Sequence, residues 1–144
     1  MLRTIKEGIL SIRVDEAPPP RFHMGEPALQ TFEGCEVDLT KGIAANLALK
    51  PLYRSELWGK IFRDLREGWL DMICTAATVT EQRKQVIDFS TPYLDTSVAI
   101  AVRRTDQARS VEDLRDHVNC VRIATTAEDA ARQKMVLAPM AVVT

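Results

Sequence analysis

The feature that most constrains the fold of this chain is a repeated switch between strand-like and helix-like periodicity in its first half. Short apolar, β-branched runs alternate with amphipathic stretches that place their apolar side chains on one face. The expected order is strand, helix, strand, helix, strand, over residues 9–14, 36–49, 50–55, 58–68 and 71–76. Such alternation predicts an α/β fold with a largely parallel sheet and helices packed on both faces.

Two polar segments follow the ends of predicted strands. Residues 15–20 come after the first strand, and residues 75–83 come after the third. In parallel α/β sheets, ligands bind beyond the carboxyl ends of the strands. We therefore expect these two segments, which are distant in the sequence, to lie on the same rim of the sheet.

Arg83 is the main candidate for a binding residue. Thr80 is predicted to cap a short helix, so Arg83 falls in the first turn, where a cation is disfavoured by roughly 0.3–1 kcal/mol unless an anion shares the site. A guanidinium pairs with a carboxylate through two parallel hydrogen bonds, and the hydroxyls of Thr75 and Thr78 would complete an anion site. The alternative is a surface arginine paired with Glu81 or Asp88, and such a pair would contribute little to stability.

Three further candidates have two interpretations each. Trp58 could be an aromatic wall against a ligand or a core tryptophan at the start of a helix. Phe22 could line the same cleft or anchor its own loop. Asp15 could hold the ammonium group of a ligand or cap the turn before the prolines at 18–20.

Composition excludes several classes of function. Apolar residues make up 46% of the chain and charged residues 27%, which is typical of a soluble globular domain. The net charge is −1, from 19 basic and 20 acidic residues, so nucleic acid and anionic membranes are poor partner candidates. The longest apolar runs are too short to span a bilayer.

Metal binding, disulfides and nucleophilic catalysis receive little support. The cysteines at 35, 74 and 120 are far apart and form no CxxC pair, so neither a metal nor a disulfide is predicted, nor any other cofactor. Cys74 lies in an apolar run and is expected to be a buried thiol. His23 and His117 are expected at the surface. No nucleophile has an adjacent base, so an enzyme has no direct support.

The second half of the chain looks unfinished. We expect a strand over 96–104, a short helix from Ser110, a strand over 118–121 and a helix over 125–135. The strand–helix unit begun at residue 118 then lacks a closing strand. The expected organisation is a first lobe over 1–104, lacking its C-terminal return, and a partial second lobe over 105–144.

Several segments occur in an order and spacing that resemble one family. They are GCEVDL (34–39), EGWLD (67–71), TVTEQR (78–83), VIDFSTPY (86–93) and SVEDL (110–114). From Ile9 to about Lys134, the chain resembles the extracytoplasmic solute-binding proteins, family 3, of polar amino-acid ABC transporters. The run VIDFSTPY is also similar to the ligand-binding cores of ionotropic glutamate receptors, which share that fold.

The resemblance implies a periplasmic-binding-protein-like (type II) fold, in which two lobes close on a free amino acid for delivery to an ABC permease. Carried over by position, Arg83 would grip the α-carboxylate of the ligand, assisted by Thr78 and by the backbone at Ala76 and Thr75. The implied location is periplasmic or extracytoplasmic, or cytoplasmic if this chain, which shows no signal peptide, is the complete gene product.

The resemblance also assigns residues elsewhere. Trp58 matches an aromatic or apolar wall, and Asp15 matches an acidic position near the first strand. In the second lobe, ATT (124–126) resembles a Gly-Thr-Thr loop of the family, so Thr126 would contact the carboxylate from the other side. Ala124 stands where the family has glycine, and Cys35 where it usually has an aromatic residue.

The resemblance places two features of longer family members beyond Thr144, namely the acidic residue that binds the ligand ammonium and the return strand to the first lobe. We therefore expect a truncated copy, a fragment, or a chain completed by another chain as a homodimer or by element swapping. Weak or no ligand binding is expected from the isolated monomer, because half of one wall would be missing.

Other functions are compatible with the same fold. The main alternative is an enzyme that resembles cyclohexadienyl or arogenate dehydratases. A sensor input domain would need a transmembrane segment or a fused kinase. A truncated remnant without function is the remaining alternative.

Overall fold

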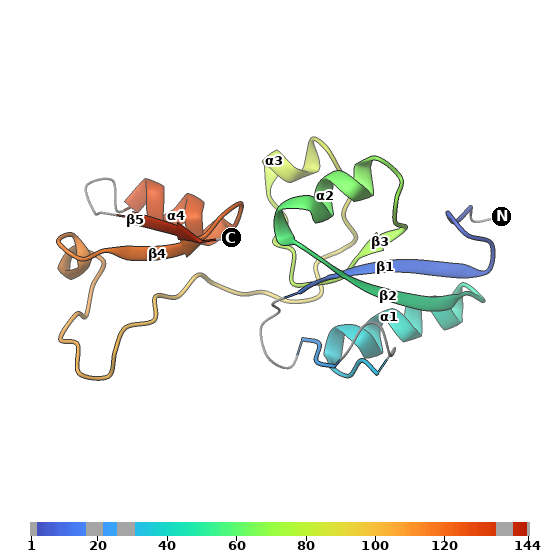
Figure 1. Cartoon of the computed structure of the whole chain (residues 1–144), viewed down its shortest axis with the longest axis horizontal. Coiled ribbons are helices and arrows are strands. Elements are labelled where there is room, and N and C mark those ends of the chain that lie inside the picture. Colours follow the sequence, from blue (N-terminus) through green and yellow to red (C-terminus); the bar gives the residue numbers. More distant parts are fainter. Residues whose placement is uncertain (1–2, 17–21, 26–30, 135–139, 144) are drawn as a thin grey trace. The chain divides into compact units, whose positions relative to one another are not determined.

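The computed structural model describes residues 3–16, 22–25, 31–134 and 140–143. The chain divides into two compact units, Met1–Ser90 and Thr91–Thr144, each with its own secondary structure (Figure 1). The lobe boundary expected after residue 104 remains a proposal. No helix in these described ranges is long and apolar enough to cross a membrane.

The first unit is built on a parallel three-stranded sheet in the order β2-β1-β3. Its elements are β1 (Ile9–Asp15), α1 (Cys35–Asn46), β2 (Lys50–Glu56), α2 (Trp58–Arg66), β3 (Met72–Ile73) and α3 (Glu81–Lys84). The predicted alternation of strands and helices is confirmed, and with it the α/β fold class. The register runs from Ile9 opposite Lys50 to Asp15 opposite Glu56, so β1 and β2 end at the same level.

The core of the first unit lies where β1 faces α1. Alternate residues of β1 (Leu10, Ile12 and Val14) are at most 5% exposed, and Ile12 is fully buried. A polar bridge crosses this layer, because the hydroxyls of Thr40 and Tyr53 lie 2.9 Å apart and join α1 to β2. Figure 1 shows α1 on one side of the sheet and α2 with α3 on the other.

The second unit contains a shorter parallel pair of strands. Its elements are the 3-10 helix η2 (Glu112–Leu114), β4 (Asn119–Arg122), α4 (Thr126–Lys134) and β5 (Met140–Val143). The expectation that the unit begun at residue 118 lacks a closing strand is wrong, since β5 pairs in parallel with β4. The run 140–143 is only four residues long and follows an apolar stretch without alternation, so its sequence gave no clear strand signal.

The strand expected over 96–104 is absent from this structure. Residues 94–103 adopt no regular element, and Val98, Ile100 and Val102 are each about half exposed, at 51%, 48% and 45%. Their alternation has the period of a strand, but a strand also requires hydrogen bonds to a neighbouring strand. None of the strand pairs of the described residues includes this segment.

Candidate functional site

The ends of β1 and β3 are held together by a buried hydrogen bond. The backbone N–H of Asp15 donates to Oγ1 of Thr75 at 3.0 Å, and the two residues are 4% and 3% exposed. The prediction that the segments after these strands share one rim is confirmed. Thr75 therefore uses its hydroxyl oxygen to position the rim.

Arg83 is held in place by its own helix and by two aromatic rings. Oγ1 of Thr80 accepts from the backbone N–H of Arg83 at 3.2 Å, which confirms the predicted cap of α3. The guanidinium carbon lies 5.3 Å from the centroid of the Trp58 ring and 4.7 Å from that of Phe62. Nη1 of Arg83 donates to the carbonyl oxygen of Thr78 at 2.9 Å.

These contacts give the guanidinium a defined place. Each cation–π contact of this kind is worth about 0.5–1 kcal/mol at an exposed site. Glu81, the acidic neighbour considered above as a partner for Arg83, pairs with Lys84 at 2.7 Å. The side chain of Arg83 is half-buried, so the two rings support the plane of the guanidinium while part of the side chain stays accessible to solvent.

Trp58 lies under the guanidinium as part of the core. It is 8% exposed and packs edge-on against Phe62, with ring centroids 5.1 Å apart. The interpretation of Trp58 as a core tryptophan is therefore confirmed, and its ring also supports Arg83. Its role as a wall against a ligand stays a prediction. Phe62 was not singled out for the site, although its spacing of four residues from Trp58 places both rings on one face of α2.

Ala76 has an unusual backbone conformation and an occupied N–H group. Its φ is 50°, in the left-handed region that costs about 1–2 kcal/mol for a residue with a Cβ. Its N–H donates to Oε1 of Glu36 at 2.5 Å, and Glu36 is 2% exposed. A ligand carboxylate would therefore have to share this N–H with Glu36.

His23 and Glu36 form a buried polar pair that the sequence analysis missed. The expectation that His23 lies at the surface is wrong, since it is 3% exposed. Its Nε2 lies 3.0 Å from the carbonyl oxygen of Asp15; because a carbonyl only accepts, Nε2 carries the hydrogen. Its Nδ1 lies 3.5 Å from Oε2 of Glu36. Through this pair, the end of β1 is connected to Ala76 after β3.

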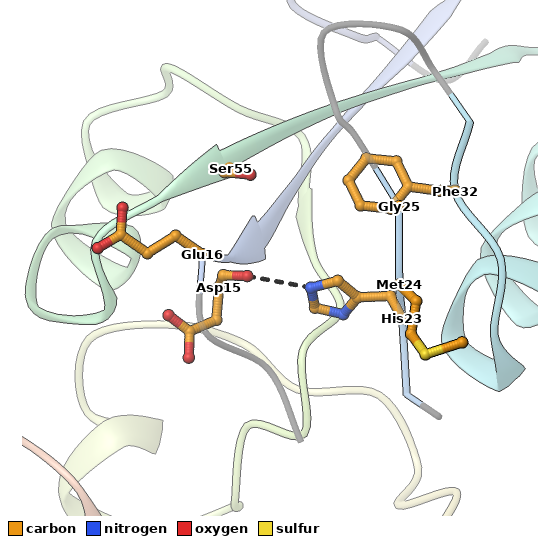
Figure 2. A pocket seen from close by; sticks show the side chains of 7 residues that line it. All are labelled: Asp15, Glu16, His23, Met24, Gly25, Phe32 and Ser55. Atoms are coloured by element: carbon orange, nitrogen blue, oxygen red, sulfur yellow. Dashed lines mark hydrogen bonds between the residues drawn. The ribbon is translucent and has the colours of Figure 1, made fainter. Parts of the chain in front are cut away.

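A hollow of about 290 Å³ opens beside this pair. Figure 2 shows its lining, where the imidazole of His23 faces the backbone of Asp15 and the carboxylates of Asp15 and Glu16 are both in view. Two carboxylates at the end of one strand favour a cationic group. Phe22 is half-buried and not part of this lining, and its carbonyl oxygen accepts from the N–H of Glu36 at 3.1 Å, at the start of α1.

Thr126 lies in the second unit, as the first residue of α4. The preceding Thr125 accepts from the N–H of Glu128 at 3.2 Å, and Oε2 of Glu128 accepts from the N–H of Ala124 at 2.8 Å. Ala124 has a φ of 60°, the region that glycine favours. The loop thus keeps its left-handed turn with an alanine, and the contribution of Thr126 to a site remains a proposal.

The described residues form no cluster of three or more histidine, cysteine or acidic side chains that could hold a metal ion. Their cysteines are free thiols, exposed at Cys35 and Cys120 and buried at Cys74. The prediction that Cys74 is a buried thiol is confirmed.

A parallel α/β sheet with helices on its faces is also the architecture of periplasmic amino-acid-binding proteins, and solved structures of such proteins are similar to this chain. The chain belongs to the bacterial extracellular solute-binding proteins, family 3, whose family model matches residues 10–136.

Several relatives show the extent of this similarity. The L-cystine-binding protein TcyJ of Escherichia coli K12 is 25% identical over 138 residues, covering 94% of this chain and 51% of the relative. The glutamine-binding protein GlnH of Bacillus subtilis is 30% identical over 96 residues, covering 65% of this chain and 35% of the relative. This chain therefore spans about half or less of the length of these relatives.

Solved structures agree over nearly the whole chain. The ancestral amino acid-binding protein AncCDT-1, a precursor of cyclohexadienyl dehydratase, matches with a TM-score of 0.85 and 29% identity, covering 94% of this chain and 61% of its own. An ancestral arginine-binding protein bound to glutamine has a TM-score of 0.85 at 27% identity, covering 96% of this chain and 61% of its own. Homologues of the chain are mainly binding proteins for amino acids.

Proposed function

We propose that this chain binds a free amino acid, with Arg83 as the group that takes the α-carboxylate. The observation that carries the proposal is the guanidinium supported by Trp58 and Phe62 and tied to the carbonyl oxygen of Thr78. A guanidinium has five N–H donors in a fixed plane, so a bond to Thr78 is compatible with a bidentate carboxylate. Because the aromatic rings hold the plane in advance, binding would cost little side-chain entropy.

The remaining candidates have supporting roles in this proposal. The hydroxyl of Thr78 and the backbone of Thr75 and Ala76 would surround the carboxylate. Asp15, buried at the end of β1, would face the cationic part of the ligand. Trp58 would support the guanidinium of Arg83 and would also form an aromatic wall against the ligand. Phe22 and Thr126, which is the first residue of α4, would make further contacts with the ligand.

The ligand class follows from the relatives together with the rim. Their names include cystine-, glutamine- and histidine-binding proteins, which share the α-amino acid group and differ in side chain. We propose delivery to an ABC permease and an extracytoplasmic location on the same grounds. Incubation with prephenate and measurement of phenylpyruvate checks the dehydratase alternative, and we expect no turnover.

The test is a titration of the ¹⁵N-labelled chain with each proteinogenic amino acid, up to millimolar ligand, followed by amide chemical shifts. We expect saturable shifts at Ala76, Thr78 and Arg83 with at least one amino acid, and no response to the corresponding amino-acid amide, which lacks the carboxylate. Absence of saturable shifts with every amino acid would contradict the proposed function.

The matched variants are Arg83→Lys and Arg63→Lys. The first keeps the positive charge at the rim and removes the planar fork, so we expect binding at least about tenfold weaker. The second makes the same change at a surface arginine that pairs with Asp64 at 3.1 Å, and should leave the affinity unchanged. Equal affinities for both variants would show that the guanidinium of Arg83 does not bind the carboxylate.

A further inference from the structure

Buried residues of the first unit form a closed ring of polar contacts around the ends of β1 and β3. The carbonyl oxygen of Asp15 accepts from Nε2 of His23 at 3.0 Å (Figure 2), and Nδ1 of His23 lies 3.5 Å from Oε2 of Glu36. Oε1 of Glu36 accepts from the N–H of Ala76 at 2.5 Å. The neighbouring Thr75 accepts from the N–H of Asp15 at 3.0 Å, so this polar ring returns to the residue at which it begins.

The imidazole of His23 has a defined orientation in the polar ring. Met24 and Glu33 exchange two backbone hydrogen bonds, at 2.8 and 2.9 Å, which hold the backbone next to His23. A Cβ added at Gly34 would lie 2.9 Å from the Cα of His23, so the two segments approach more closely here than a larger residue allows. The imidazole packs edge-on against Phe32, with ring centroids 5.8 Å apart. One nitrogen therefore faces the end of β1 and the other faces the start of α1.

One contact of the polar ring lacks a hydrogen when His23 is neutral. The carbonyl oxygen of Asp15 only accepts, so the single hydrogen of a neutral imidazole is on Nε2, and Nδ1 carries a lone pair. That lone pair faces a carboxylate oxygen of Glu36, and Nδ1 has no hydrogen-bond partner among the described residues. Two acceptors that face each other in a buried site are unfavourable, because buried polar atoms require partners. A hydrogen on Nδ1 turns the same contact into an ion pair.

We propose that a hydrogen on Nδ1 closes the polar ring, so that His23 is an imidazolium paired with the carboxylate of Glu36 at neutral pH. A buried carboxylate is stabilised by a partner of opposite charge, and the imidazolium supplies that charge to Glu36, which is 2% exposed. The carboxylates of Asp15 and Glu16, which line the same hollow as His23, also favour a positive imidazole. His23 is then a positioning residue that acts on the rim through Glu36.

This inference rests on the proposed amino-acid site, because the polar ring passes through the segment that would hold the ligand carboxylate. Ala76 has a φ of 50°, which is unfavourable for a residue with a Cβ, and its bond to Glu36 holds it in this conformation. Thr78, two residues further along, belongs to the proposed carboxylate site. Opening the polar ring would release Ala76 and let Thr78 move, so we expect ligand binding to weaken.

The protonation of His23 is measured on the chain with ¹⁵N-labelled histidine, by long-range ¹H–¹⁵N correlation spectra at neutral pH. An imidazolium carries hydrogens on both nitrogens, which resonate close together, whereas a neutral imidazole gives two widely separated ¹⁵N signals. We expect the imidazolium pattern for His23, and the variant His117→Phe assigns the signals of the other histidine. A neutral His23 in the unchanged chain overturns the proposal.

The variant Glu36→Gln provides a matched change of one group. Its amide oxygen can accept from the N–H of Ala76, and its NH₂ group can donate to Nδ1 of His23, so the polar ring closes without the additional hydrogen. We expect His23 in this variant to give the pattern of a neutral imidazole with its hydrogen on Nε2. A His23 spectrum that is the same with Glu36 and with Gln at this position also overturns the proposal.

Ligand affinity tests the positioning role. Glu36→Met has a similar length but opens the polar ring, and we expect it to bind an amino acid at least about tenfold more weakly than Glu36→Gln. His23→Phe also opens the polar ring and should lose a similar factor. The control is Asp38→Asn, which changes an exposed acidic residue of α1 and should leave the affinity unchanged.

The outcomes distinguish this inference from the proposed function. Equal affinities of Glu36→Gln, Glu36→Met and His23→Phe would show that the polar ring does not position the site. If no amino acid binds the unchanged chain, the proposed function fails, whereas the imidazole spectra still decide whether His23 carries the additional hydrogen.

Discussion

Two segments of this chain have the same period of apolar residues and opposite environments. In β1, Leu10, Ile12 and Val14 alternate with other residues and are at most 5% exposed. In the second unit, Val98, Ile100 and Val102 alternate in the same way and are 45–51% exposed. β1 has a strand on each side and a helix layer against its apolar face, whereas 94–103 has no strand partner among the described residues. Period decides which side chains share a face, but neighbouring elements decide whether that face is buried.

Matched truncations in the two segments should give the largest difference. Ile12→Ala leaves a cavity in the core and should lower the free energy of unfolding by about 2–5 kcal/mol. Ile100→Ala should change it by no more than about 0.5 kcal/mol, because the side chain of Ile100 is about half exposed. Urea unfolding followed by tryptophan fluorescence measures both. Equal losses would show that residues 94–103 are as well packed as β1.

The buried histidine of the first unit should contribute more than the exposed one of the second. His23→Phe keeps a ring of similar shape but removes the hydrogen bond to Asp15 and the contact with Glu36, and it should cost about 1–3 kcal/mol. His117→Phe is the control at an exposed position and should have little effect. Thermal unfolding measures both, and a stable His23→Phe chain would mean that the polar pair is dispensable.

The features that could be predicted from the sequence are those that depend on residues close together in the chain. The order of strands and helices in the first unit follows from local periodicity, and the cap of α3 follows from a threonine three residues before Arg83. The prediction of a strand over 96–104 was wrong, because a strand also needs a partner strand and no local sequence pattern specifies one. The strand β5 was missed because four residues are too few to show alternation.

In the candidate site, too, some features depend on local sequence and others on residues that are distant in the sequence. The shared rim could be predicted, because strand ends of a parallel sheet meet at one edge. The role of Arg83 as a binding group stays a prediction. The pair of His23 and Glu36 could not, since the two residues are far apart in the sequence and Glu36 reaches Ala76 forty residues later. A lone histidine in a loop-like segment carries no periodic signal for burial.

Both units contain an alanine held at positive φ, and glycine should relieve each. Ala76 has a φ of 50° and Ala124 a φ of 60°. Replacement by glycine removes a strain of about 1–2 kcal/mol and loses about 0.5–1 kcal/mol through unfolded-state entropy, so a gain of about 0.5–1 kcal/mol is expected at each. Ala45→Gly in α1 is the control and should destabilise by a similar amount. Calorimetric melting should show a higher melting temperature for the two variants at positive φ and a lower one for the control variant.

The first unit should respond to alkali. Burial raises the pKa of Tyr53 above its ordinary value of 10.0, and the hydrogen bond with Thr40 only partly offsets this. Because the folded pKa is the higher one, the contribution of the neutral phenol is complete below about pH 10 and is lost as pH rises through the folded value. Absorbance at the phenolate band should show a late-titrating tyrosine that Tyr53→Phe removes. A tyrosine that ionises at its ordinary pH would contradict its burial.

The second unit should respond at the opposite end of the pH scale, with the smallest effect. A hydrogen bond from Arg132 and one from the N–H of Ala124 lower the pKa of Glu128 below its ordinary value of 4.5. Because the folded pKa is the lower one, the contribution of the carboxylate is present above pH 4.5 and is lost as pH falls through the folded value. The amide shift of Ala124 should follow this titration, and Glu128→Gln should abolish it. Since this carboxylate holds only the start of α4, acid should loosen that turn while the core around Ile12 stays folded. Simultaneous unfolding of both would show that the two units are coupled.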